Sequence, residues 1–145
     1  MKGCGGSVDD LPTVVVVLAS GTNEWRKNGV LHRDSNDLPA VVYGNGTKVW
    51  WIDGKRHRRR SVDLPAVESE DGRHKEWWVD DKRHRASGDL PAIEWANGDR
   101  EWYRGGVLHR DGDLPARVYS NGDKEWYQDG ELHRCISLDQ PVAGC

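Results

Sequence analysis

Five histidines, each followed by an arginine, are the residues of this chain best suited to chemistry. The pairs recur at a nearly constant interval: His32-Arg33, His57-Arg58, His84-Arg85, His109-Arg110 and His133-Arg134. Neutral imidazole is a common metal ligand, so a row of histidines first suggests a ladder of bound metal ions. Whether such a ladder can form depends on the elements that position the histidines.

Each pair belongs to one copy of a tandem repeat, in which a tryptophan stands seven residues before the histidine. The tryptophans are Trp25, Trp50, Trp77, Trp102 and Trp126, so the period runs from 24 to 27 residues. A variable loop then leads to Asp-Leu-Pro, with prolines at Pro39, Pro65, Pro91 and Pro115. A half-copy, Asp10-Leu11-Pro12, opens the array, and the last copy reads Asp139-Gln140-Pro141. A fixed period of this size is typical of a quasi-linear array of small units.

The pattern within one repeat predicts a β-hairpin followed by a loop that carries His and Arg. A short strand follows the proline, and Asn-Gly, as at Asn121-Gly122, then predicts a type I′ turn. The second strand carries the tryptophan and ends at Gly29, Gly54, Gly106 or Gly130, or at Asp81 in the third copy. Alternation along this strand places the tryptophan on one face of the sheet and its neighbour on the other.

These units predict an all-β fold of tandem β-hairpin repeats that form an elongated, twisted, single-layer antiparallel meander. Eleven strands about 4.8 Å apart would extend over roughly 50 Å. The chain has eight Trp, no Phe and a mean hydropathy of -0.83, so we expect a shallow core built on the repeat tryptophans. We expect one domain: residues 1–9 form a flexible tail, and residues 10–145 form a single array with half-repeat caps at both ends.

This geometry argues against a metal ladder. Equivalent residues of successive repeats lie two strands apart, about 10 Å, whereas zinc ligands lie ~2.0–2.1 Å from one ion. We therefore expect no metal and no cofactor, and histidines that hydrogen-bond the loop backbone. Each arginine should pair with the following aspartate, as Arg33 with Asp37 and Arg110 with Asp113. No Gly-x-Ser-x-Gly, phosphate loop or Cys-x-x-Cys is present, so we expect no enzyme activity.

The segment Gly106-Val107-Leu108-His109, preceded by Trp102-Tyr103, resembles the MORN repeat, in which an aromatic strand precedes Gly-x-x-His-Gly. The resemblance covers residues 24–142, although arginine replaces the glycine after every histidine. The unit is more similar still to divergent Trp-x6-His-Arg…Asp-Leu-Pro-Ala repeats in proteins of large DNA viruses of amoebae and some phages. The resemblance implies a single-layer β-repeat fold, a viral protein, and a role in protein association or scaffolding, with lipid binding proposed for some members.

The apolar run Val14, Val15, Val16 and Val17 does not alternate with polar residues, which predicts a strand covered on both faces. It is also the segment most prone to associate if it is left uncovered. We expect a non-enzymatic protein–protein interaction or self-assembling scaffold module that forms a homodimer or larger assembly, with these valines as the candidate contact. An aromatic residue directly follows four of the repeat tryptophans: Trp51, Trp78, Tyr103 and Tyr127. If these side chains are uncovered, they offer another interaction surface.

The basic loops of the second and third repeats support an alternative function. Their cations are Lys55, Arg56, Arg58, Arg59, Arg60, Lys82, Arg83 and Arg85. Such a patch could bind anionic lipid or nucleic acid. The formal charge of -3 excludes a globally basic binder, and neighbouring carboxylates nearly cancel the local charge.

Cysteine usage and hydropathy bear on localisation. Cys4, Cys135 and Cys145 are odd in number and do not resemble a disulfide framework, which favours a reducing, intracellular (cytoplasmic) compartment. The resemblance to viral repeats adds association with a virion as an expectation. The start of the chain lacks the apolar segment of a secretory signal. The longest aliphatic run, 14–19, is far shorter than the ~20 residues of a membrane helix.

Overall fold

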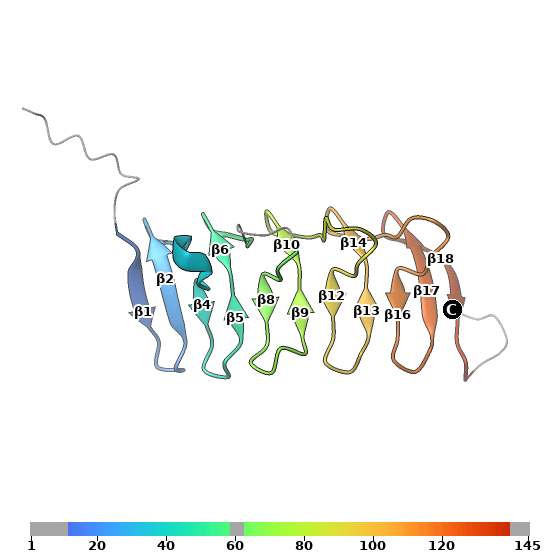
Figure 1. The fold of residues 1–145 in the computed structure, drawn as a ribbon, viewed down its shortest axis with the longest axis horizontal. Helices are drawn as coiled ribbons and strands as arrows, with labels where there is room; N and C mark the ends of the chain where they lie inside the picture. The colour runs from blue at the N-terminus through green and yellow to red at the C-terminus, as the bar shows by residue number, and fades with distance from the viewer. Residues whose placement is uncertain (1–11, 59–62, 140–145) are drawn as a thin grey trace, which may run out of the picture.

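The computed structural model describes residues 12–58 and 63–139. A twelve-stranded sheet runs along the molecule, with neighbouring strands antiparallel and in chain order (Figure 1). Its strands are β1 (Val14–Val17), β2 (Asn23–Lys27), β4 (Val41–Val42), β5 (Lys48–Val49), β8 (Val67–Glu68), β9 (Lys75–Glu76), β12 (Ile93–Glu94), β13 (Arg100–Glu101), β16 (Arg117–Val118), β17 (Lys124–Gln128) and β18 (Glu131–Ile136), with β3 (Val30–Leu31) paired to β2. The predicted all-β hairpin meander is confirmed.

Three small hairpins and one turn complete the described elements. The hairpins lie along one edge of the sheet and pair β6 (Trp51–Ile52) with β7 (Lys55–Arg56), β10 (Trp78–Val79) with β11 (Lys82–Arg83), and β14 (Tyr103–Arg104) with β15 (Val107–Leu108). A single 3-10 turn, η2, covers Ser35–Asp37. No helix within the described residues is long and apolar enough to cross a bilayer. The tail expected at 1–9 and the cap expected at 141–145 lie outside the described residues.

The repeat tryptophan joins the main sheet to the small hairpin. Trp50, Trp77 and Trp102 each stand between two strands, at the point where the chain leaves the sheet. The backbone N–H of Trp50 donates to the carbonyl of Ala66 in the next repeat at 2.8 Å, and its carbonyl accepts from His57 N–H at 3.1 Å. The tryptophan backbone therefore bonds forward to the next repeat and closes its own hairpin.

The Asn-Gly turns differ from the prediction. At Asn45-Gly46, Asn97-Gly98 and Asn121-Gly122 only the glycine has a positive φ, so these are not type I′ turns. They are three-residue loops in which Gly46 N–H bonds Tyr43 O at 2.9 Å and the glycine takes the left-handed conformation. Two positive φ values in succession, as type I′ requires, occur instead in the small hairpins and their equivalents, at Asn28-Gly29, Asp53-Gly54, Asp80-Asp81, Gly105-Gly106 and Asp129-Gly130.

Tryptophan and alanine form a repeated stripe in the core, which also contains Val41, Val49, Ile52, Trp78 and Ile93. Trp50, Trp77, Trp102 and Trp126 are buried, whereas Trp25 beside the first strand is half-buried. The alanine after each repeat proline is at most 1% exposed: Ala40, Ala66, Ala92 and Ala116. A methyl side chain leaves room for an indole ring to lie close to the strand backbone, so these two residue types pack together in a single layer.

Two expectations about the ends of the array are wrong. The four valines of β1 are 59%, 47%, 37% and 69% exposed, so this strand is not covered on both faces. Among the strands of the described residues it pairs with β2 alone, so it lies at the edge of the sheet. Cys135 in β18 is disulfide-bonded, which removes the basis for inferring a reducing compartment from the cysteine pattern.

Candidate functional site

The guanidinium of every His-Arg pair lies over the ring of the tryptophan eight residues before it. The distance from guanidinium carbon to ring centroid is 4.1 Å for Arg33 on Trp25, 3.9 Å for Arg58 on Trp50, 3.7 Å for Arg85 on Trp77, 3.8 Å for Arg110 on Trp102 and 3.9 Å for Arg134 on Trp126. These are cation–π contacts, each worth roughly 0.5–2 kcal/mol depending on burial. The arginine thus closes the tryptophan face of the single-layer sheet.

The same guanidinium joins two successive repeats. In Arg110, Nη1 donates to the carbonyl of Pro115 at 3.0 Å, and Nη2 donates to Asp89 in the preceding repeat at 2.6 Å. Arg58 binds Asp37, and Arg85 binds Asp63, in the same way at 2.6 and 2.7 Å. The predicted pairs within one repeat, Arg33 with Asp37 and Arg110 with Asp113, are therefore wrong, because Asp37 binds Arg58 and Arg110 binds Asp89.

The path of the Asp-Leu-Pro loop explains this shift. The loop leaves its own arginine and crosses to the tryptophan of the following repeat, whose indole Nε1 donates to the aspartate carbonyl. This bond is 2.9 Å for Trp50 to Asp37, 3.2 Å for Trp102 to Asp89 and 3.0 Å for Trp126 to Asp113. The aspartate therefore lies beside the next arginine along the chain. Trp77 is the exception, because its buried Nε1 has no hydrogen-bond partner among the described residues.

The histidines form a second connection between repeats. Nδ1 of each accepts a backbone N–H from the next repeat's type I′ turn: His32 from Asp53 (3.0 Å), His57 from Asp80 (3.4 Å), His84 from Gly105 (3.3 Å) and His109 from Asp129 (3.1 Å). The second turn residue adds a backbone bond, as Gly130 N–H to Leu108 O at 2.9 Å. The expected bond to loop backbone is present and extends into the following repeat. His133 lies in the edge strand β18 and is exposed.

The carboxylates beside His109 lie at opposite nitrogens of its ring. Nδ1 of His109 lies 3.0 Å from the Asp129 carboxylate, whereas Nε2 lies 2.9 Å from Asp111 and also contacts the Arg104 guanidinium. The two nitrogens point away from each other, so the two carboxylates cannot share one ion with this ring. Within the described residues, no group of three His, Cys, Asp or Glu side chains could hold a metal ion.

Most arginines proposed to bind anions already have partners inside the protein. Arg58 and Arg85 are only 12% and 8% exposed, in the clamps described above. Arg56 stacks on Trp78 at 3.7 Å and binds Asp81 at 2.9 Å, and Arg83 stacks on the same ring at 4.8 Å. Lys55 and Lys82 are exposed. Arg59 and Arg60 lie outside the described residues.

Glutamates and arginines cover the aromatic side chains that follow the repeat tryptophans, on the opposite face of the sheet. Glu76 accepts from Trp78 Nε1 at 2.8 Å, and Glu101 accepts from the Tyr103 hydroxyl at 2.8 Å. Burial alone would raise the pKa of Glu76, but hydrogen bonds from His74 and Trp78 outweigh it and hold that pKa below its usual value. Burial raises the pKa of Tyr103, and the bond to Glu101 raises it further. Much of this face is therefore a polar network rather than an uncovered apolar surface.

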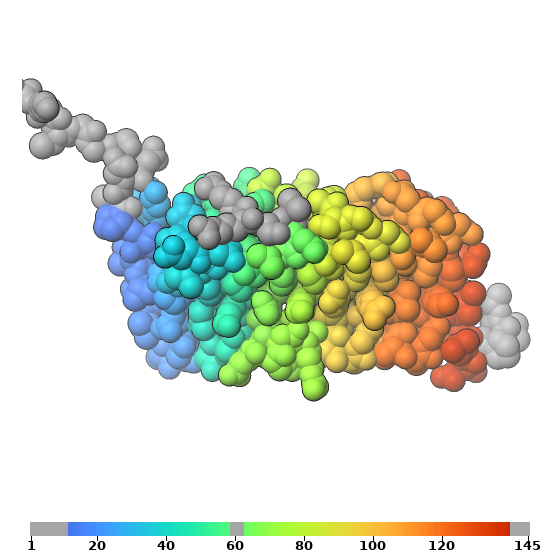
Figure 2. All heavy atoms as spheres, viewed as in Figure 1, coloured from blue at the N-terminus to red at the C-terminus, as the bar shows by residue number. Residues whose placement is uncertain are grey.

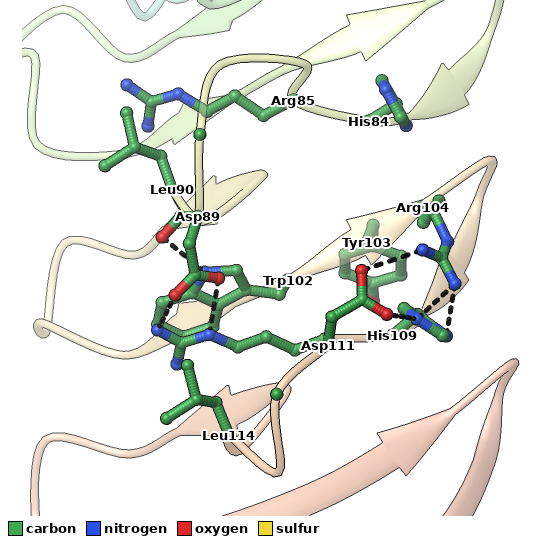
Figure 3. A pocket seen from close by; sticks show the side chains of 13 residues that line it. His84, Arg85, Asp89, Leu90, Trp102, Tyr103, Arg104, His109, Asp111 and Leu114 are labelled. Carbon is green, nitrogen blue, oxygen red and sulfur yellow. Dashed lines mark hydrogen bonds and ion pairs between the residues drawn. The ribbon is translucent and has the colours of Figure 1, made fainter.

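A shallow pocket of about 340 Å³ lies between the third and fourth loops. Figure 3 shows Leu90 and Leu114 on opposite sides of it, with Trp102 and Asp89 between them. At its other end Asp111 contacts Arg104 and His109. The leucines of the four Asp-Leu-Pro motifs within the described residues are all exposed: Leu38, Leu64, Leu90 and Leu114.

The edge strand β1 presents a different surface. Leu18 N–H bonds Thr22 O at 2.9 Å, and Val14 to Val17 lie opposite Arg26 to Asn23. Hydrogen-bonded and non-hydrogen-bonded pairs alternate along an antiparallel ladder, so Val14 and Val16 bond β2. The N–H and C=O groups of Val15 and Val17 point away from β2, toward the outer edge. Figure 2 shows this strand at one end of the array.

Comparisons with protein-family models, with curated proteins and with solved structures give no match for this chain.

Proposed function

We propose that this chain is a non-enzymatic scaffold module that self-associates through the edge strand β1. The observation that carries this proposal is the combination of four exposed valines with outward-pointing backbone groups on Val15 and Val17. An edge strand of this kind is a template for pairing with another chain. Pairing would satisfy those groups and cover valine surface on both faces of the sheet.

The rest of the array supports a structural role. The His-Arg pairs recur in every repeat and are used to join repeats, so their chemistry maintains a rigid, extended sheet. The resemblance to MORN repeats supports scaffolding by analogy alone. Membership of that family and a viral origin stay predictions.

Sedimentation velocity over a concentration series tests the proposal. The wild-type chain should form a larger species as its concentration rises through the micromolar range. Val15→Lys combined with Val17→Lys should abolish that species, because lysine side chains on an edge strand oppose pairing with another chain. Val79→Lys in β10 is the matched control and should assemble normally, since Val79 is also an exposed strand valine.

Circular dichroism of each variant shows whether the sheet is retained. A wild-type chain that stays monomeric at these concentrations would refute the proposal. Assembly of the double-lysine variant equal to wild type would refute it as well.

Binding of anionic lipid or nucleic acid is the second candidate function, favoured by exposed Lys55 and Lys82 at equivalent positions of successive repeats. Phosphate binding through them would weaken steeply with rising salt. Flotation with phosphatidylserine vesicles, and gel shift with duplex DNA, should then show binding that Lys55→Glu with Lys82→Glu removes. Unchanged binding in this variant would exclude the two lysines as the site.

A further inference from the structure

We infer that the assembly is a closed two-fold dimer in which β1 pairs antiparallel with β1 of a second copy. This inference rests on the proposed self-association and specifies its partner and symmetry. The alternative is a head-to-tail filament in which β1 of one copy pairs with β18 of the next. Strand direction, edge chemistry and register all distinguish these two arrangements.

Strand direction favours the two-fold arrangement. The main path of the sheet contains eleven strands from β1 to β18, and every neighbouring pair along it is antiparallel. The first and eleventh strands therefore run in the same direction. Stacking copies head to tail by translation would pair β1 with β18 in parallel, whereas a two-fold axis normal to the sheet pairs β1 with its copy antiparallel.

An antiparallel β1–β18 contact would require one copy to turn over. The tryptophan face of one molecule would then continue as the glutamate face of its neighbour. The two-fold arrangement keeps each face continuous across the junction, and continues the antiparallel pattern of the whole array. It also brings the same surface of each copy together, which closes the assembly at two.

The chemistry of the two edge strands also favours the two-fold arrangement. β1 carries no charge, and its residues would oppose valine or threonine in a second copy. β18 carries Glu131 and Arg134 on its exposed surface, and its pairing with β17 shifts register between Trp126 and Tyr127. Charges and bulges are features that protect natural edge strands from pairing. A β1–β18 contact would bury those charges against valine.

The outward-pointing backbone groups set the register. Val15 and Val17 present them to the outer edge, and by alternation so does Thr13, one residue before the strand. The register that uses all three residues places Val15 opposite Val15 of the second copy, and Thr13 opposite Val17. Valine side chains then line both faces of the junction.

Photo-crosslinking with a diazirine amino acid, photo-leucine, at position 15 tests this arrangement. Equal amounts of ¹⁵N-labelled and unlabelled chain are mixed, so that mass spectrometry identifies cross-links between copies. The expected cross-link joins position 15 to residues 13–17 of the other copy. Photo-leucine at Leu132 in β18 is the matched control and should give no cross-link between copies.

Mass measured over the concentration series completes the test. The mass should level off at twice the 16.4 kDa of one chain. Cross-links from position 15 to β18, or a mass that keeps growing, would overturn the two-fold arrangement while the proposed self-association stands. A monomer at every concentration would overturn both.

Discussion

The guanidinium of Arg110 lies 2.6 Å from the carboxylate of Asp89, twenty-one residues earlier in the chain and one repeat away. The same guanidinium covers Trp102, whose indole N–H donates to the backbone carbonyl of that aspartate. One tryptophan, one arginine and one aspartate from two repeats therefore form a closed contact. Repetition of this contact gives a single-layer sheet a continuous core.

This contact predicts measurable coupling between Arg110 and Asp89. In a double-mutant cycle of Arg110→Ala and Asp89→Ala, the coupling free energy should be about 1 kcal/mol, because the charges are partly desolvated and bidentate. The measurement is the free energy of unfolding in urea. Arg134 and Asp113 provide the control, since they lie 4.0 Å apart and are mostly exposed. Equal coupling in the two pairs would contradict a specific clamp.

The position of a tryptophan in the array should determine its contribution to stability. Trp77→Ala should lower the free energy of unfolding by roughly 3–5 kcal/mol, because the side chain is 4% exposed. Trp25→Ala should cost less, because Trp25 is only half-buried. Urea melts followed by circular dichroism compare the two variants. Equal losses would mean that the tryptophans do not form one continuous core.

Another hydrogen-bond acceptor should be able to replace Nδ1 of His109. His109→Ala leaves the Asp129 N–H without its partner and should cost about 1–3 kcal/mol. His109→Asn can restore an acceptor oxygen near the position of Nδ1 and should recover part of this loss. His133→Ala, at an exposed site, is the control and should change stability by less than about 0.5 kcal/mol. Thermal melts that rank Asn below Ala would contradict an acceptor role.

Glu76 should make stability depend on pH in the acid range. Its pKa is lower in the folded protein than in the unfolded chain, so its contribution is present above the unfolded pKa, about 4.3. That contribution is lost as pH falls through the lower, folded pKa. Between pH 7 and 3, the difference in unfolding free energy between wild type and Glu76→Gln should shrink. Glu131→Gln, at an exposed site, is the control; a difference independent of pH would contradict this assignment.

The period of the sequence was sufficient to predict the architecture, because every repeat must bury its tryptophan against a neighbour. It did not predict which repeat supplies the aspartate that binds each arginine. Arg110 is close in sequence to Asp113 and binds Asp89, because the path of the loop over Trp102 decides the pairing. That path is a tertiary feature, and no local pattern near Arg110 encodes it.

The turns show a second limit of sequence patterns. Asn-Gly is compatible with a type I′ turn, yet Asn45 keeps a negative φ because a three-residue loop is formed there. Asp80-Asp81, a weaker signal, takes two positive φ values. The residue before the repeat tryptophan gives another example: it is Val49 in one repeat, but Glu76 and Glu101 in two later repeats. The Trp51 indole N–H is accordingly buried without a hydrogen bond, a consequence visible only once the two side chains are seen to share one face.

Amide hydrogen exchange of β1 by NMR, at low and high protein concentration, tests the central claim most directly. Val14 and Val16 bond β2 in every copy, so their amides should be protected at both concentrations. The outward amides of Val15 and Val17 should exchange rapidly in dilute protein and become protected as the concentration rises. Exchange of Val15 and Val17 that stays rapid and independent of concentration would contradict association through this edge.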